Sequence, residues 1–383
     1  MNKTKFLFAL CALIFVGLCL FHYFSARPLW LDEEFVFKNL LHHGYGDLLG
    51  PLQPVQSFPR LYLIFIKAFS VNFNYDVLSL RLASLLCMLG AYFLLMKLVI
   101  IDCRDDLAAV LTLFAICASY KFSYYAAELK PYSMDVLVVA VYAYYFHYQR
   151  IFESSAPTKT DCWVAAILPL LMFFSYASLF VFWVVGFNFL LQSRKNRDLR
   201  RILLLNSAVS IVCFMAFYWF DIRHSITQPG VEYWDGHFIS YASFEGFWDK
   251  FGDGIRRMVI YPFDGIKPMR YAASVFIPFF VFASFIFGIS RLRKDSLMIY
   301  HCDSLAFLLF AELFVLGSLQ LYPFTGERLT LFFSPFVIYL VVKGITGLVK
   351  QPLLRKGLAG YYFVFYLICL VRTIYLHLQY YAS

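Results

Sequence analysis

The sequence predicts an all-α protein that crosses a membrane many times, and three observations lead to this fold class. Of the 383 residues, 61% are hydrophobic and 15% are charged, whereas a soluble domain is about half apolar and about a quarter charged. The mean hydropathy is +0.68. The basic residues behind the +9 net charge lie in short clusters between apolar runs. This pattern is typical of cytoplasmic loops and does not indicate a nucleic-acid surface.

Ten apolar runs approach the ~20 residues that span a bilayer. They cover residues 6–24, 77–101, 107–124, 134–148, 162–191, 202–220, 271–289, 305–321, 329–345 and 358–378. Lys3 and Lys5 precede the first run. No small-x-small cleavage site follows it, so we expect an uncleaved first helix. A further run, 61–73, is short and is accompanied by Arg60 and Lys67.

The basic clusters constrain the number of crossings, because lysine and arginine mark cytoplasmic loops. They lie around residues 3–5, 150–159, 194–201, 291–294 and 350–356. All are cytoplasmic if 162–191 forms two short helices with a turn at 175–178 and 61–73 lies on the outer surface. The alternative is a crossing helix at 61–73 and one tilted helix over 162–191, which moves residues 150–159 outside.

We expect the first arrangement: a single domain over residues 1–383, about 11 transmembrane helices, the N-terminus inside and the C-terminus outside. The first outer loop then covers 25–76 and carries surface helices. A second long outer loop covers 221–269, with an amphipathic helix over 240–260 because its aromatic residues recur at helical spacing. The nine cysteines are scattered, so we expect buried, unpaired thiols.

The first chemical motif is acidic and directly follows the first apolar run. Asp32, Glu33 and Glu34 open an expected helix over 31–41, where carboxylates near a bilayer are costly and often functional. The alternative is a capped surface helix, because acidic residues also stabilise helix N-termini.

Two further motifs fall in predicted outer loops. Residues 128–132 read Glu-Leu-Lys-Pro-Tyr and place Glu128 beside Lys130 at a helix entry. Residues 326–329 read Gly-Glu-Arg-Leu, and an arginine there is a suitable fork for phosphate. The alternatives are an interfacial anchor for the first motif and a flanking charge for the second. Asp221, His224, Asp235, His237 and Asp264 match no strong metal-ligand spacing.

Together the three motifs resemble the multi-spanning glycosyltransferase C superfamily, nearest to bacterial members related to protein O-mannosyltransferases and lipid A aminoarabinose transferases. The resemblance implies surface helices in the first outer loop and transfer of a sugar from a polyprenyl-phosphate carrier to an acceptor hydroxyl. It implies that Asp32 is the catalytic base, that Glu33 and Glu128 are further acidic residues of the active site, and that Arg328 meets the carrier phosphate. The later helices are fewer than in the O-mannosyltransferases, so the acceptor is not implied.

Lys130 is the second cation expected at the phosphate, and Tyr132 and Glu327 belong to the same motifs and are expected at the substrate site. Two cations can stabilise a leaving phosphate, so no metal or other cofactor is expected, with a divalent ion as the alternative. The expected partners are the lipid-linked donor, a glycan, lipid or protein acceptor, and the bilayer. The expected location is the inner (plasma) membrane, with the active site on the extracytoplasmic face.

Two other functions remain open from the sequence. A flippase or transporter of lipid-linked sugars would carry charges near the bilayer midplane and inverted repeats. Glu312 lies deep in an apolar run, but no repeat is evident. An oligosaccharide polymerase or ligase would also have a long outer loop, but it would not need the acidic motif at 32–34.

Overall fold

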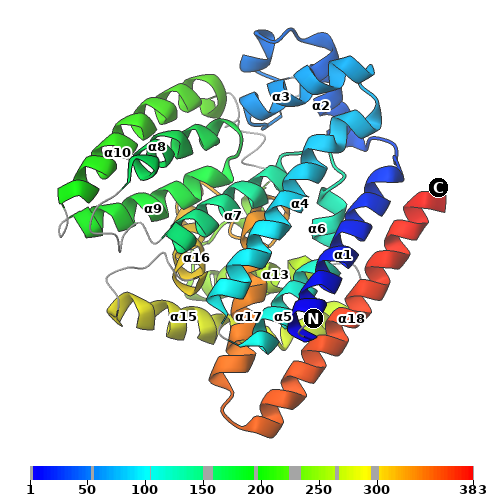
Figure 1. Ribbon diagram of the computed structural model, residues 1–383, viewed down its shortest axis with the longest axis vertical. Coiled ribbons are helices and arrows are strands. Elements are labelled where there is room, and N and C mark those ends of the chain that lie inside the picture. The colour runs from blue at the N-terminus through cyan, green and yellow to red at the C-terminus, as the bar shows by residue number, and fades with distance from the viewer. Residues whose placement is uncertain are drawn as a thin grey trace.

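All regular structure in the described part of the chain is helical, as the composition predicts (Figure 1). The computed structural model describes residues 3–52, 56–103, 105–149, 158–193, 197–223, 234–263, 267–294 and 302–382. Parts of the predicted loops and basic clusters, including Arg150, Arg194, His224 and Asp264, lie outside these ranges. Among the described residues, six helices are long and apolar enough to cross a membrane: Lys3–Phe24, Val77–Asp102, Arg200–Ile222, Tyr271–Ser290, Arg328–Leu348 and Pro352–Gln379. The count of about 11 crossings stays a prediction.

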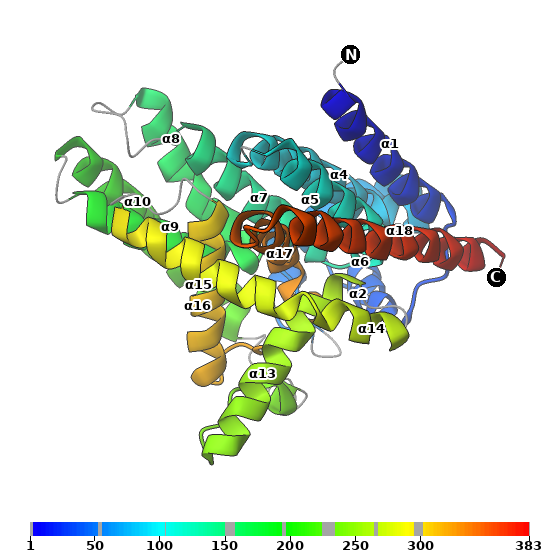
Figure 2. The ribbon, with the colours of Figure 1, turned by 90° about the horizontal axis from the view of Figure 1, so that it is seen from below.

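The helices follow the predicted apolar runs closely. They are α1 (Lys3–Phe24), α2 (Leu31–His42), α3 (Arg60–Ser70), α4 (Val77–Asp102), α5 (Asp106–Ala118), α6 (Tyr120–Tyr125), α7 (Tyr132–Gln149), α8 (Lys159–Ile167), α9 (Ala177–Ser193), α10 (Arg197–Phe217), α13 (Phe244–Ile260), α14 (Lys267–Ser274), α15 (Ile277–Lys294), α16 (Cys302–Ser318), α17 (Ser334–Leu348) and α18 (Pro352–Ala382). Short 3-10 segments include η3 (Leu168–Phe173) and η7 (Arg328–Phe333). Figure 2 shows α13 and α16 projecting from the rest of the bundle on one side.

Several of the predicted runs are interrupted; the run at 271–289 divides between α14 and α15, and two others divide as follows. The run at 162–191 divides into α8 with η3 and then α9, as the two-helix prediction requires. Asp135 of α7 explains the break, because its carboxylate accepts hydrogen bonds from the Ser175 hydroxyl (2.6 Å) and the Ala177 N–H (3.5 Å) at the start of α9. The run at 107–124, expected to be continuous, also breaks. There Ser119 is extended, and its hydroxyl donates to the Pro262 carbonyl.

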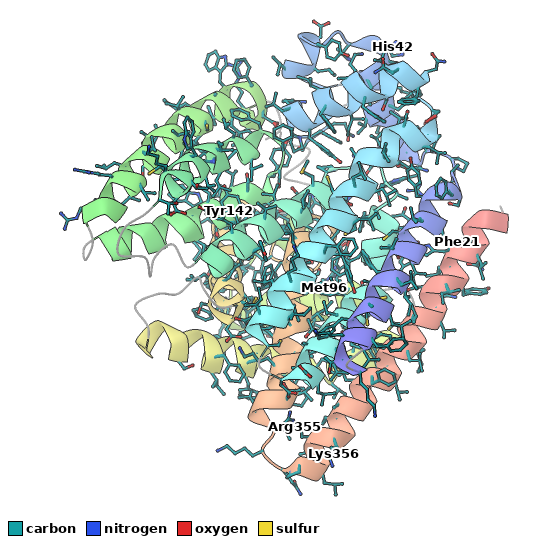
Figure 3. All side chains as sticks on the ribbon, in the orientation of Figure 1. Phe21, His42, Met96, Tyr142, Arg355 and Lys356 are labelled. Carbon is teal, nitrogen blue, oxygen red and sulfur yellow. The ribbon has the colours of Figure 1, made fainter. Side chains whose placement is uncertain are left out.

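Polar contacts join the helices at the end of the bundle where α1 begins and α4 ends. There, Thr4 of α1 bonds Asp106 of α5 at 2.8 Å, and Arg355 of α18 pairs with Asp105 at 2.5 Å. Asp102 at the end of α4 accepts from Tyr339 of α17. Figure 3 labels Arg355 and Lys356 at this end and His42 of α2 at the opposite one.

The short helices α2 and α3 share a small core of their own with the first turns of α4. Val36, Leu40, Tyr62, Ile66 and Leu80 are among its buried members. Eleven residues of α3 extend over only about 16 Å, roughly half of the hydrocarbon core. The placement of residues 61–73 on the outer surface stays a prediction.

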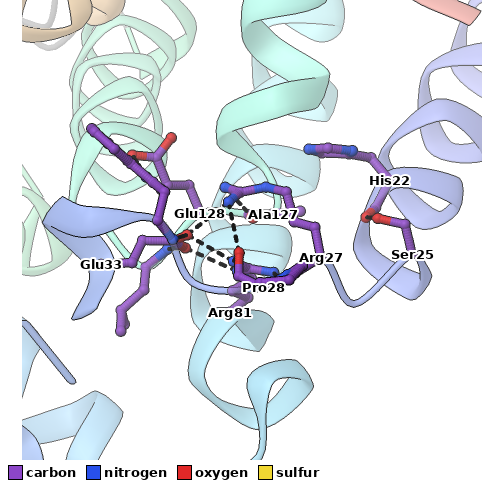
Figure 4. A network of polar contacts seen from close by, with 10 residues as sticks. His22, Ser25, Arg27, Pro28, Glu33, Arg81, Ala127 and Glu128 are labelled. Carbon is purple, nitrogen blue, oxygen red and sulfur yellow. Dashed lines mark hydrogen bonds and ion pairs between the residues drawn. The ribbon is translucent and has the colours of Figure 1, made fainter. Parts of the chain in front are cut away.

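A buried ion network joins α1, α2, α4 and the loop before α7 (Figure 4). The carboxylate of Glu33 is fully buried and pairs with Arg27 at 2.8 Å and Arg81 at 2.7 Å. It also accepts the Leu129 N–H at 2.7 Å. Arg81 donates in addition to the Arg27 carbonyl at 2.7 Å. With several bonds to charged groups in a dry environment, the network fixes both the position and the rotation of α2.

We predict that Glu33→Gln destabilises the protein strongly, because it leaves two guanidinium groups buried without their anion. Removing one partner of a buried ion pair costs about 3–5 kcal/mol. Thermal unfolding of the purified protein in detergent measures the effect. The control is Glu34→Gln, one position along the same helix and exposed, which should change stability by no more than about 0.5 kcal/mol. Equal unfolding midpoints for the two variants would contradict a structural role of Glu33.

Candidate active site

A cavity of about 620 Å³ lies where the starts of α2, α7, α9 and η7 meet the ends of α10 and α16. Its size falls within the range of small-molecule sites. Five charged residues line it: Asp32, Asp135 and Glu312 are acidic, and Lys130 and Arg328 are basic. The remaining wall is largely aromatic and aliphatic, formed by Tyr132, Tyr176, Leu179, Phe180, Trp183, Phe214, Ile222, Trp234, Leu316, Leu321, Tyr322 and Leu329, with Gln56, Ser57 and Pro131.

Asp32 and Arg328 form an ion pair across this cavity, although 296 residues separate them. The Arg328 Nη1 atom lies 2.6 Å from the Asp32 Oδ2 atom, and both side chains are about one quarter exposed. Asp32 faces the cavity because α2 turns about 100° per residue and Glu33 faces the buried network. Arg328 begins η7, whose first turn is capped by Glu327 and Thr330.

Lys130 is the second cation in the cavity wall. Its ammonium donates to the Gln56 side-chain carbonyl at 2.8 Å. Burial lowers the pKa of Lys130, and the nearby charge of Asp32 acts in the opposite direction. Asp32, Lys130 and Arg328 therefore influence one another's charges in this cavity, in a setting that excludes much of the solvent and strengthens such interactions.

Glu128 lies behind the cavity wall and not in it. Its side chain is fully buried, and its Oε1 accepts from the Trp30 indole at 3.3 Å. Its Oε2 has no hydrogen-bond partner within the described ranges. Burial, and then the charge of Glu33, raise the pKa of Glu128 from its ordinary 4.5 to about 7. The Trp30 ring also lies 5.7 Å from the Arg328 guanidinium, so it separates Glu128 from the ion pair.

The structure brings together four of the seven residues that the sequence singled out. Asp32, Lys130, Tyr132 and Arg328 all line the cavity. Glu33 is enclosed in the ion network, and Glu128 is buried behind Trp30. Glu327 points to Arg257 of α13 at 3.7 Å and is 37% exposed.

Sequence reasoning did not select Asp135 and Gln56, and it noted Glu312 only as a deep charge. Asp135 and Glu312 both lie inside apolar runs, and this is the signal by which an ionisable residue in a membrane helix can be recognised. The Oε2 atom of Glu312 has no hydrogen-bond partner among the described side chains. Gln56 lies in a loop, and nothing in its sequence surroundings marks it.

Metal ligands were weighed for the loop over 221–269. Over the ranges that the structure describes, no three His, Cys, Asp or Glu side chains converge as a metal site requires. His224 and Asp264 lie outside those ranges. Independence from metal stays a prediction.

Comparisons with known proteins find no family model, no curated protein and no solved structure that matches the chain.

We predict that Glu128 makes the stability of the protein fall as the pH rises. Its pKa is higher in the folded chain, so the folded state binds more protons than the unfolded state between about pH 4.5 and 7. Stability is lost across that interval as the buried carboxyl ionises. Glu128→Gln stays neutral and should unfold at a higher temperature than the wild type at pH 8, with the difference shrinking toward pH 5. A difference that does not depend on pH would show that Glu128 is not the titrating group.

Proposed function

We propose that this chain is an integral membrane glycosyltransferase that moves a sugar from a polyprenyl-phosphate carrier to an acceptor hydroxyl. The observation that carries the proposal is the ion pair of one carboxylate, Asp32, with Arg328, and the presence of a second cation, Lys130, in the wall of the same largely apolar cavity. A lipid-linked sugar phosphate needs cations for its phosphate, apolar surface for its lipid and a base for the incoming hydroxyl. The motif resemblance implies the same reaction.

In the proposed reaction, Asp32 accepts the proton of the acceptor hydroxyl as that oxygen bonds to the anomeric carbon. The bond from this carbon to the phosphate oxygen breaks at the same time, which inverts the anomeric centre. The carrier phosphate leaves with the bonding electron pair. Arg328 and Lys130 stabilise its developing charge, so no proton has to be donated to the leaving group.

The ion pair between Asp32 and Arg328 implies that the donor binds before the acceptor. While Arg328 donates to the Oδ2 atom of Asp32, one lone pair of the carboxylate is occupied and is not available to an acceptor hydroxyl. A donor phosphate competes for the guanidinium, which binds two oxygens of one anion in a planar fork. Donor binding thus releases Asp32 for the acceptor. Glu33 and Glu128 have no part in this step, and both are assigned to positioning the surrounding loop and α2.

We place the cavity on the extracytoplasmic side of an inner (plasma) membrane, with about 11 crossings and α2 and α3 on the outer surface. Supporting this placement, Lys3, Arg355 and Lys356 lie at the helix ends remote from α2, and basic clusters mark the cytoplasmic side. In Figure 1, α1 and α18 run in the same direction, which agrees with an N-terminus inside and a C-terminus outside.

A second candidate is a transporter of lipid-linked sugars, which Glu312 favours. Its carboxyl lines the cavity from within α16, and ionisable groups at such depth often mark a transport path. Reconstitution in vesicles separates the two functions. An enzyme consumes donor and forms product when both substrates are on the outer side, whereas a transporter moves intact donor and forms no product.

We predict that the two ends of the bundle label from opposite sides. In a background without the nine native cysteines, Glu34→Cys on α2 should react with an impermeant reagent on intact cells. Lys356→Cys on α18 should react only after the cells are opened. Both positions are exposed, so accessibility within the protein does not separate them. The reverse pattern would overturn the proposed sidedness.

We predict that Asp32→Asn abolishes transfer and yet tightens phosphate binding. Loss of a general base lowers the rate by about 10²–10⁴-fold, measured as transfer in membranes that carry the donor. Freeing Arg328 from a partly exposed ion pair should strengthen binding of a short polyprenyl phosphate by about 2- to 5-fold. Arg328→Ala should weaken it by roughly 10- to 150-fold. Glu34→Gln, which removes an exposed charge from the same helix, is the control.

A double-mutant cycle separates competition for Arg328 from simple repulsion between two anions. In an Arg328→Gln background, Asp32→Asn should leave polyprenyl phosphate binding unchanged. If the tightening persists without Arg328, repulsion explains it and the ordered release of Asp32 is wrong. If Arg328→Ala binds the phosphate as well as the wild type, Arg328 is not the phosphate ligand.

A further inference from the structure

The segment that leads into Arg328 is packed between two helices. Phe324 lies against Phe251 of α13 with ring centroids 5.8 Å apart and against Phe314 of α16 at 6.0 Å. Its backbone N–H donates to the His237 carbonyl at 2.9 Å. The chain before α13 therefore contacts this segment too, and Trp234 of that stretch lines the cavity.

Three glycines, Gly254, Gly317 and Gly326, lie where this segment packs against α13 and α16, and none of these positions has room for a Cβ atom. A Cβ at Gly254 of α13 would lie 2.6 Å from the Phe324 carbonyl oxygen and would overlap its ring. A Cβ at Gly317 of α16 would lie 2.6 Å from the Phe324 Cβ. A Cβ at Gly326 would overlap the backbone carbonyl of Arg257 in α13. Glycine in a helix costs about 1 kcal/mol relative to alanine, so Gly254 sits in α13 at a disadvantage that this close approach offsets.

Two hydrogen bonds within residues 322–330 tie this segment together. The Thr330 hydroxyl donates to the Thr325 carbonyl at 2.8 Å, and the Tyr322 hydroxyl donates to the Leu329 carbonyl at 2.7 Å. Each of these two bonds joins a residue before Arg328 to a residue after it. A displacement at Phe324 or Gly326 is therefore passed on to the guanidinium and to its contact with Asp32.

We propose that α13 and α16 position the phosphate-binding arginine, and that Gly254 of α13, Gly317 of α16 and Gly326 of the intervening segment are the positioning residues through which they do so. The inference rests on the proposed function for its ligand, a polyprenyl phosphate. These glycines touch no substrate. They set the distance between Arg328 and Asp32, and hence the geometry in which the phosphate is received.

The test compares two alanine substitutions on the same helix. Gly254→Ala inserts a methyl group against Phe324, whereas Gly252→Ala, two residues earlier, enters open space. We expect Gly254→Ala to weaken binding of a short polyprenyl phosphate by about 10-fold, a large part of the loss for one charge-assisted contact. Gly252→Ala should bind it as the wild type does.

Two further arms exclude a purely structural effect. In an Arg328→Gln background, Gly254→Ala should cause no additional loss of phosphate binding, because the residue that it misplaces is already gone. Adding Phe324→Leu to Gly254→Ala removes the overlap with the ring but not the contact with the Phe324 carbonyl oxygen, so it should restore binding in part. Equal binding by Gly254→Ala and Gly252→Ala, or a loss by Gly254→Ala that persists without Arg328, would overturn the proposal.

A readout without ligand separates this proposal from the proposed function. In thermal unfolding, the effects of Asp32→Asn and Arg328→Gln on the free energy of unfolding should be non-additive in the wild-type background. They should be additive in the Gly254→Ala background, because the two side chains are then too far apart to interact. If polyprenyl phosphate binds the protein equally well with and without Arg328, the proposed function is wrong. The non-additivity between Asp32→Asn and Arg328→Gln then remains as the test of the positioning role. Unchanged non-additivity in Gly254→Ala would reject it.

Discussion

The buried pairing of Glu33 with Arg27 and Arg81 is the constraint on which the rest of the site depends. One carboxylate accepts bonds from the end of α1, from α4 and from the backbone of Leu129. Three separate stretches of chain are thereby held to α2. Because α2 is held in rotation as well as in position, the carboxylate one residue earlier, Asp32, can face only the cavity. The network also fixes the loop that contains Lys130, so both of these charges depend on the same buried anion.

Arg328 reaches the cavity by an independent route. The buried network orders Asp32 and Lys130 from the N-terminal side, whereas α13 and α16 enclose the segment that ends in Arg328. The ion pair between Asp32 and Arg328 is the place where the two halves of the site meet. Such a pair is worth little as a stabilising contact when it is partly exposed. It is therefore better understood as an arrangement of reactive groups than as a structural bond.

Much of the fold could be predicted from the sequence, because the apolar runs end close to the ends of the helices. The division of 162–191 was also predictable, since a run of 30 residues exceeds what a bilayer needs. The break at Ser119 was not, because it depends on a bond to Pro262 that only the tertiary fold creates. The same limit separates Asp32 from Glu33. They are adjacent and both acidic, and only Arg81, 48 residues away, decides which is buried and which faces the cavity.

Under the proposed function, the charges in the cavity explain why Asp32 is paired before a donor arrives. Three carboxylates and two cations line the wall, and of these Asp32 and Arg328 are in direct contact while Asp135 accepts a serine hydroxyl. An unpaired arginine in a partly dry cavity would pay for its lost hydration, and an unpaired Asp32 beside an incoming phosphate would repel it. Exchange of one anion for another on Arg328 avoids the first of these costs, since the guanidinium keeps an anionic partner throughout. In the proposed reaction, the same exchange leaves Asp32 without its cation only when a phosphate is present, which is when that reaction needs a base.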